Sequence, residues 1–418
     1  MKYNVLVEGP YLTQSGYGEH ARLVLDSLRH REDVEVYGLP LEWGKTSWIS
    51  SDDEDRKWYD EVSQKLRHTQ PDKFDVHVFV GVPNELTKKA EKAICVTAGI
   101  EVDRVSPQWL VKSHEIDKII VPSKWSKEVF DKSSYVTNAN QENTEKETLE
   151  CACPVEVIPY SIRKYQSDKD FDKVLSDKLE YDFNFLVVAQ WGPRKNIENT
   201  ISWFVEEFKE EKVGLVLKTN YSRSCNMDFV NCQKSLSKLL KNIDPNSDRL
   251  CKVVLLHGDL QEEQLGSLYT NKKIKAIISA THGEGFGLPL FEAACHELPV
   301  CATNATGHVD FLYAKNKKGN LSPHFAPVEF YVSEVPDQFI WEGIIEKQSR
   351  WCYPTAESFK QQMRLVYKDY RKYKSFAKKL NTNIKEIFSE KAVMESMASA
   401  IIGDLESELE ELDLKVFS

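Results

Sequence analysis

The sequence has no apolar run long enough to cross a membrane. A spanning helix needs about 18 to 20 consecutive apolar residues, and no stretch of the 418 residues provides them. The chain also opens directly on a short apolar segment, Tyr3–Val7, without the charged region and cleavage site of a signal peptide. We therefore expect no transmembrane segment and a cytoplasmic location.

No two cysteines have the C-x-x-C spacing of a zinc or redox site, although the chain contains nine cysteines. An odd number of cysteines, several of them in apolar segments, is typical of reduced thiols in a cytosolic protein. Cys151 and Cys153 lie close together beside Pro154, but no further ligands accompany them, and we interpret both as bystanders. We expect neither a metal site nor a cofactor.

An excess of positive charge is also absent, because the chain has 55 basic and 65 acidic residues and a formal net charge of −10. This excludes a surface that is basic all over, of the kind that coats nucleic acid or adheres to membranes. Half of the excess, however, lies in Asp404–Ser418, which has six acidic residues and one lysine. The rest of the chain is only mildly acidic, so a local basic groove for a polyanion stays open.

What the chain does have is an alternation of short Val/Ile/Phe-rich runs with longer amphipathic stretches. The expected strands are Tyr3–Val7, Val34–Gly38, Val76–Val80, Ala93–Thr97, Lys118–Val121, Val155–Ile158, Phe183–Ala189, Val213–Thr219, Val253–His257, Ile274–Ser279 and Pro299–Thr303. The expected helices include Glu19–Arg29, Trp125–Asp131 after an N-cap at Ser123, Asn199–Phe208 and Leu290–His296. The predicted fold class is therefore α/β, with two Rossmann-like, doubly wound domains that face each other across a cleft.

Weakly patterned segments indicate how the chain is divided. Residues 133–151 are rich in Asn, Glu, Thr and Lys and are predicted to form an exposed insertion. Residues 165–182 are charged, and we place the domain boundary there because linkers favour exposed polar chain. Residues 313–355 are expected to be irregular. The predicted parts are residues 1–165, residues 166–395, and an acidic helical tail, 396–418, that crosses back to the first domain.

The strongest motif is a glycine-rich loop that follows the predicted strand Ile274–Ser279. From position 281 it reads Thr-His-Gly-Glu-Gly-Phe-Gly-Leu-Pro, and a helix begins near Pro289. Three glycines in five positions let the backbone approach a ligand closely, and the free N–H groups of the helix favour an anion such as a diphosphate. Glu292, in the first turn of the helix, can accept hydrogen bonds from ribose hydroxyls. Glu284, in the loop, can contact another part of the same ligand.

Glu284 and Glu292, with the Gly-Phe-Gly-Leu-Pro between them, resemble the Glu-x7-Glu signature of retaining GT-B glycosyltransferases, and the C-terminal half is similar to family 4 of that class. The resemblance implies a GT-B fold with C-terminal helices, an acceptor-side first domain and a second domain that binds a nucleotide sugar. It also implies that Glu284 contacts the transferred sugar and that Glu292 binds the ribose. The implied donor-binding residues of this region are His282, Gly285, Phe286, Gly287, Leu288 and Glu292.

A second motif, Gln190-Trp-Gly-Pro-Arg194-Lys195, follows the predicted strand Phe183–Ala189. Two adjacent cations at this turn are placed to clamp a diphosphate leaving group and so lower the barrier to its departure. The family usually has an arginine and, five positions later, a lysine. Lys195 matches the lysine, whereas Gln190 stands at the arginine position. We therefore expect Arg194 to supply the missing charge, and both cations to be catalytic and donor-binding.

Two N-terminal motifs complete the predicted site. The loop before the first helix matches a glycine-containing family loop that faces the diphosphate and the acceptor. Its donor-side residues are Gly16 and Gly18, and its acceptor-side residues are Tyr17, Glu19 and His20, although a histidine at a helix start is more often structural. Further on, Glu101 either orients an acceptor hydroxyl, as in a family variant with a glutamate here, or pairs with Arg104.

A last family feature is a turn of small residues after the final sheet strand. Thr303–Phe311 stands at this place, and we expect it to pack against the glycine-rich loop. His308 and Asp310 in this turn are predicted to be structural rather than catalytic.

Together the motifs and the resemblance predict an enzyme, a hexosyl- or pentosyltransferase, that moves a sugar from a nucleotide diphosphate sugar to a hydroxyl group with retention at the anomeric carbon. The leaving phosphate oxygen helps to remove the acceptor proton, so neither a metal nor a protein nucleophile is required. The absence of a Ser-His-Asp motif agrees with this mechanism. Closure of the two domains would exclude water, which otherwise hydrolyses the donor.

The sequence leaves the acceptor open between two classes. A glycan or lipid-linked glycan is preferred. The motifs around Gly16 and Glu101, with the segment Trp43–Trp48, also resemble glycosyltransferases of large tailed phages, some of which modify hydroxymethylated DNA bases in the bacterial host's cytoplasm. In that case Arg56-Lys57 and Lys88–Lys92 would form a local phosphate-binding face.

Two alternatives to a transferase also stay open. A non-catalytic nucleotide-sugar-binding protein is supported only by Gln190. A GT-B epimerase is disfavoured because those enzymes lack the Glu-x7-Glu arrangement.

Overall fold

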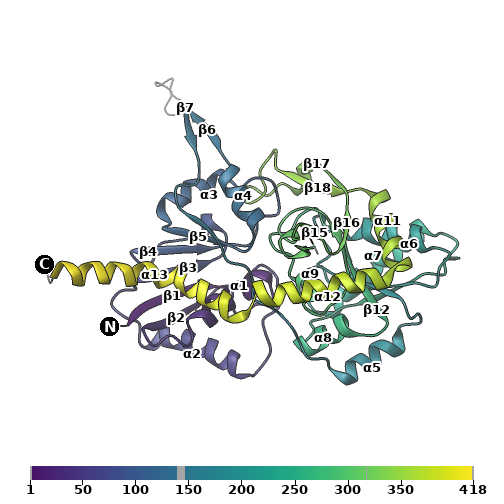
Figure 1. Ribbon diagram of the computed structural model, residues 1–418, viewed down its shortest axis with the longest axis horizontal. Coiled ribbons are helices and arrows are strands. Elements are labelled where there is room, and N and C mark those ends of the chain that lie inside the picture. Colours follow the sequence, from purple (N-terminus) through teal and green to yellow (C-terminus); the bar gives the residue numbers. More distant parts are fainter. Residues whose placement is uncertain (1, 139–145, 317, 417–418) are drawn as a thin grey trace. The chain divides into compact units, whose positions relative to one another are not determined.

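The computed structural model describes residues 2–138, 146–316 and 318–416, which form two compact units (Figure 1). The first unit comprises Met1–Ser161, Ile340–Ser349 and Phe388–Ser418, and the second comprises Ile162–Phe339 and Arg350–Ile387. The chain leaves the first unit at Ser161, where the sequence predicted a boundary at residue 165. It returns for a short segment before its final helix joins the first unit.

The first unit is built on a sheet of six parallel strands in the order β2-β1-β3-β4-β5-β8, as the alternation of the sequence predicts. Its strands are β1 (Tyr3–Gly9), β2 (Val34–Pro40), β3 (Val76–Val80), β4 (Lys92–Val96), β5 (Lys118–Val121) and β8 (Val155–Val157). Every residue of β3 is buried, as expected for a central parallel strand covered on both faces. Its other elements are the helices α1 (Gly16–Leu28), α2 (Glu54–His68), α3 (Pro107–Lys112) and α4 (Lys124–Lys132), and the 3-10 turns η1 (Pro83–Glu85) and η2 (Ser113–Glu115).

Side-chain caps fix where the helices of the first unit begin. The hydroxyl of Ser15 accepts a hydrogen bond from the backbone N–H of Gly18, which starts α1. Ser123 caps α4 in the same way by accepting from the N–H of Ser126, so the predicted N-cap is confirmed. α1 then buries Ala21, Val24 and Leu28 along one face, at helical spacing.

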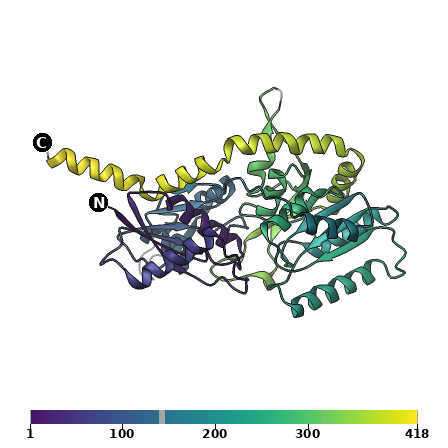
Figure 2. The same ribbon diagram turned by 90° about the horizontal axis from the view of Figure 1, so that it is seen from below.

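Two further elements of the first unit lie outside the sheet. β6 (Tyr135–Asn138) and β7 (Lys146–Leu149) pair antiparallel within the predicted insertion, project from the unit in Figure 1, and flank residues 139–145, which are outside the described part. α13 (Glu390–Val416) packs on α1 and β3 (Figure 2). It buries Val393, Met397 and Ile401 at a spacing of one turn. The acidic side chains predicted for residues 404–418 lie outside the described part.

The second unit is a sheet of six parallel strands in the order β11-β10-β9-β12-β13-β16. Its strands are β9 (Asn184–Val188), β10 (Gly214–Lys218), β11 (Lys252–Leu256), β12 (Ile274–Ser279), β13 (Val300–Thr303) and β16 (Ala326–Val328). Its helices are α5 (Lys169–Lys178), α6 (Ile197–Phe208), α7 (Asn226–Ile243), α8 (Glu262–Thr270), α9 (Leu288–Cys295), α10 (Val309–Leu312), α11 (Ala356–Lys368) and α12 (Tyr370–Ile387). The strand order reverses between β9 and β12, and this makes the carboxyl ends of these two strands the switch point of a doubly wound sheet.

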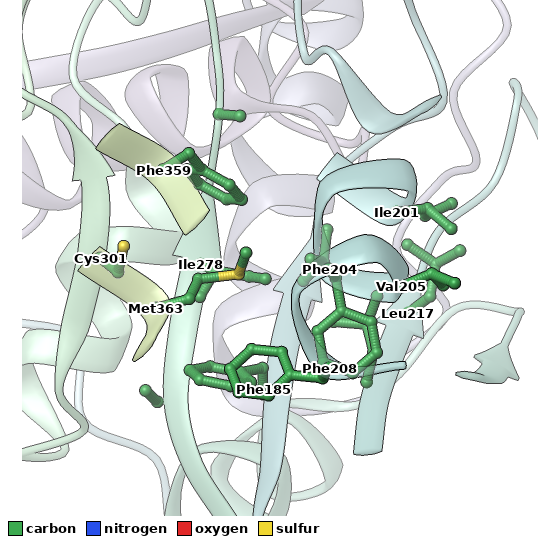
Figure 3. Close-up of a cluster of buried hydrophobic side chains, with 14 of the residues drawn as sticks. Phe185, Ile201, Phe204, Val205, Phe208, Leu217, Ile278, Cys301, Phe359 and Met363 are labelled. Carbon is green, nitrogen blue, oxygen red and sulfur yellow. The ribbon is translucent and has the colours of Figure 1, made fainter. Parts of the chain in front are cut away.

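The core of the second unit fastens α6 and α11 to the sheet. Phe185 of β9 packs against Phe204 and Phe208 of α6, with Phe359 and Met363 of α11 in the same cluster (Figure 3). All five side chains are fully buried. Truncating a buried Phe to Ala typically costs about 3–5 kcal/mol, so these phenylalanines contribute strongly to the packing of α6 and α11 on the sheet.

The prediction of irregular chain for residues 313–355 is wrong. This region contains β14 (Tyr313–Lys315), β15 (Leu321–Pro323), β16, β17 (Phe330–Glu334), the 3-10 turn η3 (Asp337–Phe339) and β18 (Arg350–Pro354). β14 pairs with β15 and β17 with β18, both antiparallel, and β16 forms an edge of the second sheet. Strands of three to five residues with proline at edge positions give too short an alternation to be recognised.

A second correction concerns residues 165–182, where the weak pattern hid the helix α5. Among the helices described, none combines the length and the apolar character that a bilayer requires.

Candidate functional site

Two loops meet at the switch point of the second sheet, one after β9 and one after β12. The backbone N–H of His282 donates to the carbonyl of Arg194 (2.8 Å), and the Arg194 guanidinium donates to the carbonyl of Gly283 (2.6 Å). The Asn196 amide donates to the carbonyl of Ala280 (3.0 Å). In open α/β sheets, ligands bind at this edge and at this point of the strand order. The two motifs predicted to act together are therefore joined into one structure.

Glu284 lies between the two predicted cations. Its carboxylate accepts both contacts of the Lys195 ammonium, at 2.6 and 2.7 Å, and its Oε2 lies 3.3 Å from the Arg194 guanidinium. The Glu284 side chain is only 9% exposed. The three side chains together carry one net positive charge beside a glycine-rich loop, an arrangement that suits an anionic ligand.

The cations keep Glu284 ionised. Burial alone would raise the pKa of its carboxyl, but the charges of Lys195 and Arg194 lower the pKa from 4.5 to about 2. A carboxylate in this state cannot act as a general acid near neutral pH. It can hold the two cations and offer negative charge to a ligand that develops positive charge.

The ion cluster should therefore make stability depend on pH. Because the folded pKa of Glu284 lies below its ordinary value of 4.5, the stabilisation is complete above about pH 4.5 and is lost as the pH falls toward 2. The full contribution is on the order of 3 kcal/mol. We expect the free energy of unfolding in urea to fall less steeply over this pH range for Glu284→Gln than for the wild type. If the free energy of unfolding fell equally steeply with pH in both proteins, the lowered pKa of Glu284 would be contradicted.

The turn after β13 packs against the glycine-rich loop and forms hydrogen bonds with its backbone. The hydroxyl of Thr306 accepts from the N–H of Glu284 (3.0 Å), and the N–H of Gly307 donates to the carbonyl of Glu284 (2.9 Å). Gly287 adopts a positive φ of 89° and lies against His308. The His308 ring is fully buried and bonds to the carbonyl of Thr303 (2.6 Å). The predicted packing of this turn against the loop is confirmed.

Gly307 is expected to be required for this contact. A Cβ at position 307 would lie 2.0 Å from the carbonyl oxygen of Gly285, and backbone atoms cannot move aside cheaply. We expect Gly307→Ala to lower the stability of the protein by about 1–3 kcal/mol, measured by urea unfolding. Gly192→Ala is the matched control because a Cβ at position 192 meets nothing within 4 Å. Equal losses in the two variants would refute the close approach.

Glu292 is buried in the second turn of α9 rather than in the predicted first turn, because the helix begins at Leu288. It belongs to a network that the sequence did not reveal. Its Oε1 accepts from the Arg163 guanidinium (3.0 Å) and the Tyr165 hydroxyl (3.1 Å), and its Oε2 accepts from the Tyr269 hydroxyl (2.8 Å). His296 bonds to the carbonyl of Glu292 (2.7 Å). These partners lie up to 129 residues from Glu292 in the sequence and share no local pattern with it.

His282 and Gln190 point to other neighbours. The His282 ring stacks on Trp351 (5.3 Å between centroids) and contacts Tyr353 (4.5 Å), both on β18. Burial lowers its pKa to about 4, so the ring is neutral near pH 7. The Gln190 amide donates to the carbonyl of Tyr221 (2.5 Å). In the loop after β9, Arg194 and Lys195 contact the Glu284 carboxylate, whereas the Gln190 amide contacts the backbone of Tyr221.

The predicted acceptor-side residues lie in the first unit, and two of them are buried there. The Tyr17 hydroxyl bonds to the Thr97 hydroxyl (2.8 Å) and to the N–H of Gly99 (2.9 Å). His20 is fully buried, its ring lies 4.8 Å from that of Tyr160, and neither ring nitrogen has a hydrogen-bond partner among the described residues. Burial lowers the pKa of His20 to about 3, so the ring is neutral.

Three of the remaining predicted residues of the first unit, Gly16, Glu19 and Glu101, are closer to its surface, whereas Gly18 is buried. Glu19 is half-buried and pairs with Arg22 at 2.5 Å. Gly16 is exposed, whereas Gly18 has no room for a side chain because a Cβ would lie 2.2 Å from the carbonyl of Thr13. Glu101 is half-buried in the loop after β4.

The expected partner of Glu101 makes another contact. The Arg104 guanidinium lies 3.7 Å from the carboxylate of Asp103. The role of Glu101 stays a prediction.

Comparison with known proteins agrees with the fold and with the second unit. Residues 168–329 match the family model described as Glycosyl transferases group 1, and this range contains both Glu284 and Glu292. A segment of 120 residues, 28% of this chain, is 33% identical to the serotype-specific mannosyltransferase WbdA of Escherichia coli. The chain matches only 13% of the length of that protein.

Solved structures resemble the whole chain at low sequence identity. A sucrose-phosphate synthase from Thermosynechococcus elongatus is 14% identical with a TM-score of 0.62, and the match covers 98% of this chain and 100% of that one. A glycosyltransferase from Rickettsia africae is 13% identical with a TM-score of 0.59, covering 96% and 99%. HepE from Anabaena, solved with UDP and glucose, is 12% identical with a TM-score of 0.57, covering 96% and 100%. The expected GT-B fold is thereby confirmed, and its second unit carries the group 1 glycosyltransferase match.

Proposed function

We propose that this protein is a retaining glycosyltransferase of the family 4 type, which transfers a sugar from a nucleotide diphosphate sugar to a hydroxyl group. The observation that carries the proposal is the buried, ionised Glu284 between Lys195 and Arg194, beside the glycine-rich loop at the switch point of the second sheet. A glycine-rich loop or an ion pair alone has many uses. Their combination, in a segment that matches a glycosyltransferase family model, supports this one.

The cations and the loop are proposed to bind the diphosphate. Lys195 and Arg194 stabilise the negative charge that builds up on the phosphate oxygens as the sugar–phosphate bond breaks. Glu284 contacts the sugar, which develops positive charge at its anomeric carbon in the same step. Glu292 receives the ribose hydroxyls, and the departing phosphate oxygen takes the proton of the attacking hydroxyl from the same face. No protein nucleophile enters this mechanism.

A hexose is the proposed sugar. HepE was solved with UDP and glucose, and the matching segment of WbdA belongs to a mannosyltransferase. UDP-glucose and GDP-mannose are therefore the first donors to test, ahead of pentose donors.

A glycan is the proposed acceptor because the basic segments of the first unit are neutralised. Arg56 pairs with Asp60 (3.0 Å), and Lys57 lies 3.7 Å from Glu54. Lys88 pairs with Asp117 (3.2 Å), and Lys89 pairs with Glu8 (2.5 Å). Cations paired in this way add little to the binding of a DNA backbone, which depends on neutralising phosphates.

The test is to incubate the protein with each nucleotide sugar and a panel of oligosaccharides and to determine the product's anomeric configuration by proton NMR. We expect an α-linked product from an α-linked donor. A β-linked product would refute retention. Transfer to hydroxymethylated DNA but not to any oligosaccharide would overturn the proposed acceptor. It would not affect the proposal that the donor is a nucleotide diphosphate sugar.

A further inference from the structure

A cluster of three metal-ligating side chains lies at another part of the second sheet's carboxyl edge. Asp228 and Cys232 project from α7 at a spacing of four residues, and His257 follows the end of β11. One ligand atom from each lies within 4.8 Å of the other two, and this is the one such trio of His, Cys, Asp or Glu in the described part of the chain. The site could not be predicted from the sequence, because the ligands are 4 and 25 residues apart and match no common zinc spacing.

The thiol and the imidazole converge on one carboxylate oxygen. His257 Nε2 lies 2.8 Å and Cys232 Sγ 3.5 Å from Oδ1 of Asp228. Zinc–ligand bonds of about 2.0 Å for N and O and about 2.3 Å for S set ligand atoms about 3.3–3.5 Å apart in a tetrahedral site. The sulfur–oxygen distance already fits, the nitrogen–oxygen distance is about 0.5 Å too short, and the sulfur and the nitrogen lie within 4.8 Å of each other.

All three side chains of the cluster are shielded from solvent. Cys232 is fully buried, and the side chains of Asp228 and His257 are each 6% exposed. A thiolate and a carboxylate together supply two negative charges, which would make a site with one divalent ion and a neutral imidazole electrically neutral.

The Asp228 carboxylate is also anchored by three backbone N–H groups. Its Oδ2 accepts from the N–H groups of Ser222 (2.8 Å) and Arg223 (3.2 Å), while the N–H of Tyr221 donates to Oδ1 (3.0 Å). Such contacts orient a ligating carboxylate.

We propose that Asp228, Cys232 and His257 bind a zinc ion. Mixed oxygen, nitrogen and sulfur ligands around a small buried site suit Zn²⁺ better than Mg²⁺ or Ca²⁺, which prefer oxygen ligands alone. The ion would tie the loop at residues 221–223 and α7 to the end of β11. This site is separate from the proposed sugar transfer, which needs no metal, so either proposal can fail without the other.

The test is the metal content of the full chain, purified without chelators after growth with added zinc and measured by mass spectrometry. We expect about one zinc per wild-type chain, and a loss of at least tenfold in Cys232→Ser and in His257→Ala. Cys225→Ser is the matched control because Cys225 is exposed at the N-cap of the same helix. It should retain the metal.

A second measurement covers the case in which the variants do not fold. Cobalt added to the metal-free wild type should produce the absorption band of a thiolate–cobalt bond, and zinc should abolish that band while raising the Tm. Wild-type protein that holds no zinc and gives no cobalt band would overturn the proposal and leave a hydrogen-bonded cluster. Zinc retained in both ligand variants would also overturn it.

Discussion

Replacing Glu284 by Gln is expected to lower sugar transfer by about 100- to 1,000-fold, the range seen when one preorganised electrostatic contact to a transition state is removed. Glutamine keeps the size of the side chain but removes the charge that Lys195 and Arg194 hold in place. The affinity for the nucleoside diphosphate product should not fall, since both cations remain and no longer have to share their charge with a carboxylate. The measurement is kcat for transfer together with the Kd of the product by calorimetry.

The control for this change is Glu198→Gln, which alters an exposed glutamate in the first turn of α6. It should keep wild-type kcat. Because Glu284→Gln also removes a stabilising ion pair, its activity is measured well below its Tm, with circular dichroism to verify the fold. Wild-type turnover in Glu284→Gln would remove Glu284 from the site.

Replacing Lys195 by Ala is expected to have the second large effect, this time on binding. We expect the Kd of the nucleoside diphosphate to rise by about 10- to 100-fold, which corresponds to about 1.4–2.8 kcal/mol and is typical of one lost charge-assisted hydrogen bond. Transfer should fall further, because the leaving group gains negative charge as the bond breaks. Lys195→Arg, which preserves the charge, should recover part of both losses.

Lys212→Ala serves as the control because Lys212 is exposed in the loop before β10. It should change neither the Kd nor the transfer rate. The same small change in Kd for Lys195→Ala and Lys212→Ala would show that the Lys195 ammonium does not contact the diphosphate.

Much of the fold and part of the site followed from the sequence. Alternating apolar runs and amphipathic stretches predicted both parallel sheets, since buried parallel strands and their covering helices leave strong periodic patterns. The placing of both motifs at one donor site was also predicted from the sequence, although the ion pair between Lys195 and Glu284 was not. Both residues come directly after strands that are neighbours in the sheet.

The features that the sequence did not reveal depend on contacts between distant segments. Arg163 reaches Glu292 from before α5, and no local spacing relates the two residues. β17 and β18 are short strands separated by a segment of the first unit, so neither has a neighbouring strand in sequence to reveal the pairing. Asp228 and His257 likewise meet only because β10 and β11 are adjacent in the sheet.

The most direct test of the proposed function is to ask whether a nucleotide sugar that binds is also cleaved. The wild-type protein is mixed with UDP-glucose, GDP-mannose and related donors, and the rise in Tm is compared with the nucleoside diphosphate released over time. A donor that raises the Tm should also be cleaved, slowly to water and faster with an acceptor sugar, and Glu284→Gln should bind it without cleaving it. A wild-type protein that binds a donor and releases no nucleoside diphosphate with any acceptor would contradict the proposed sugar transfer and identify a binding protein instead.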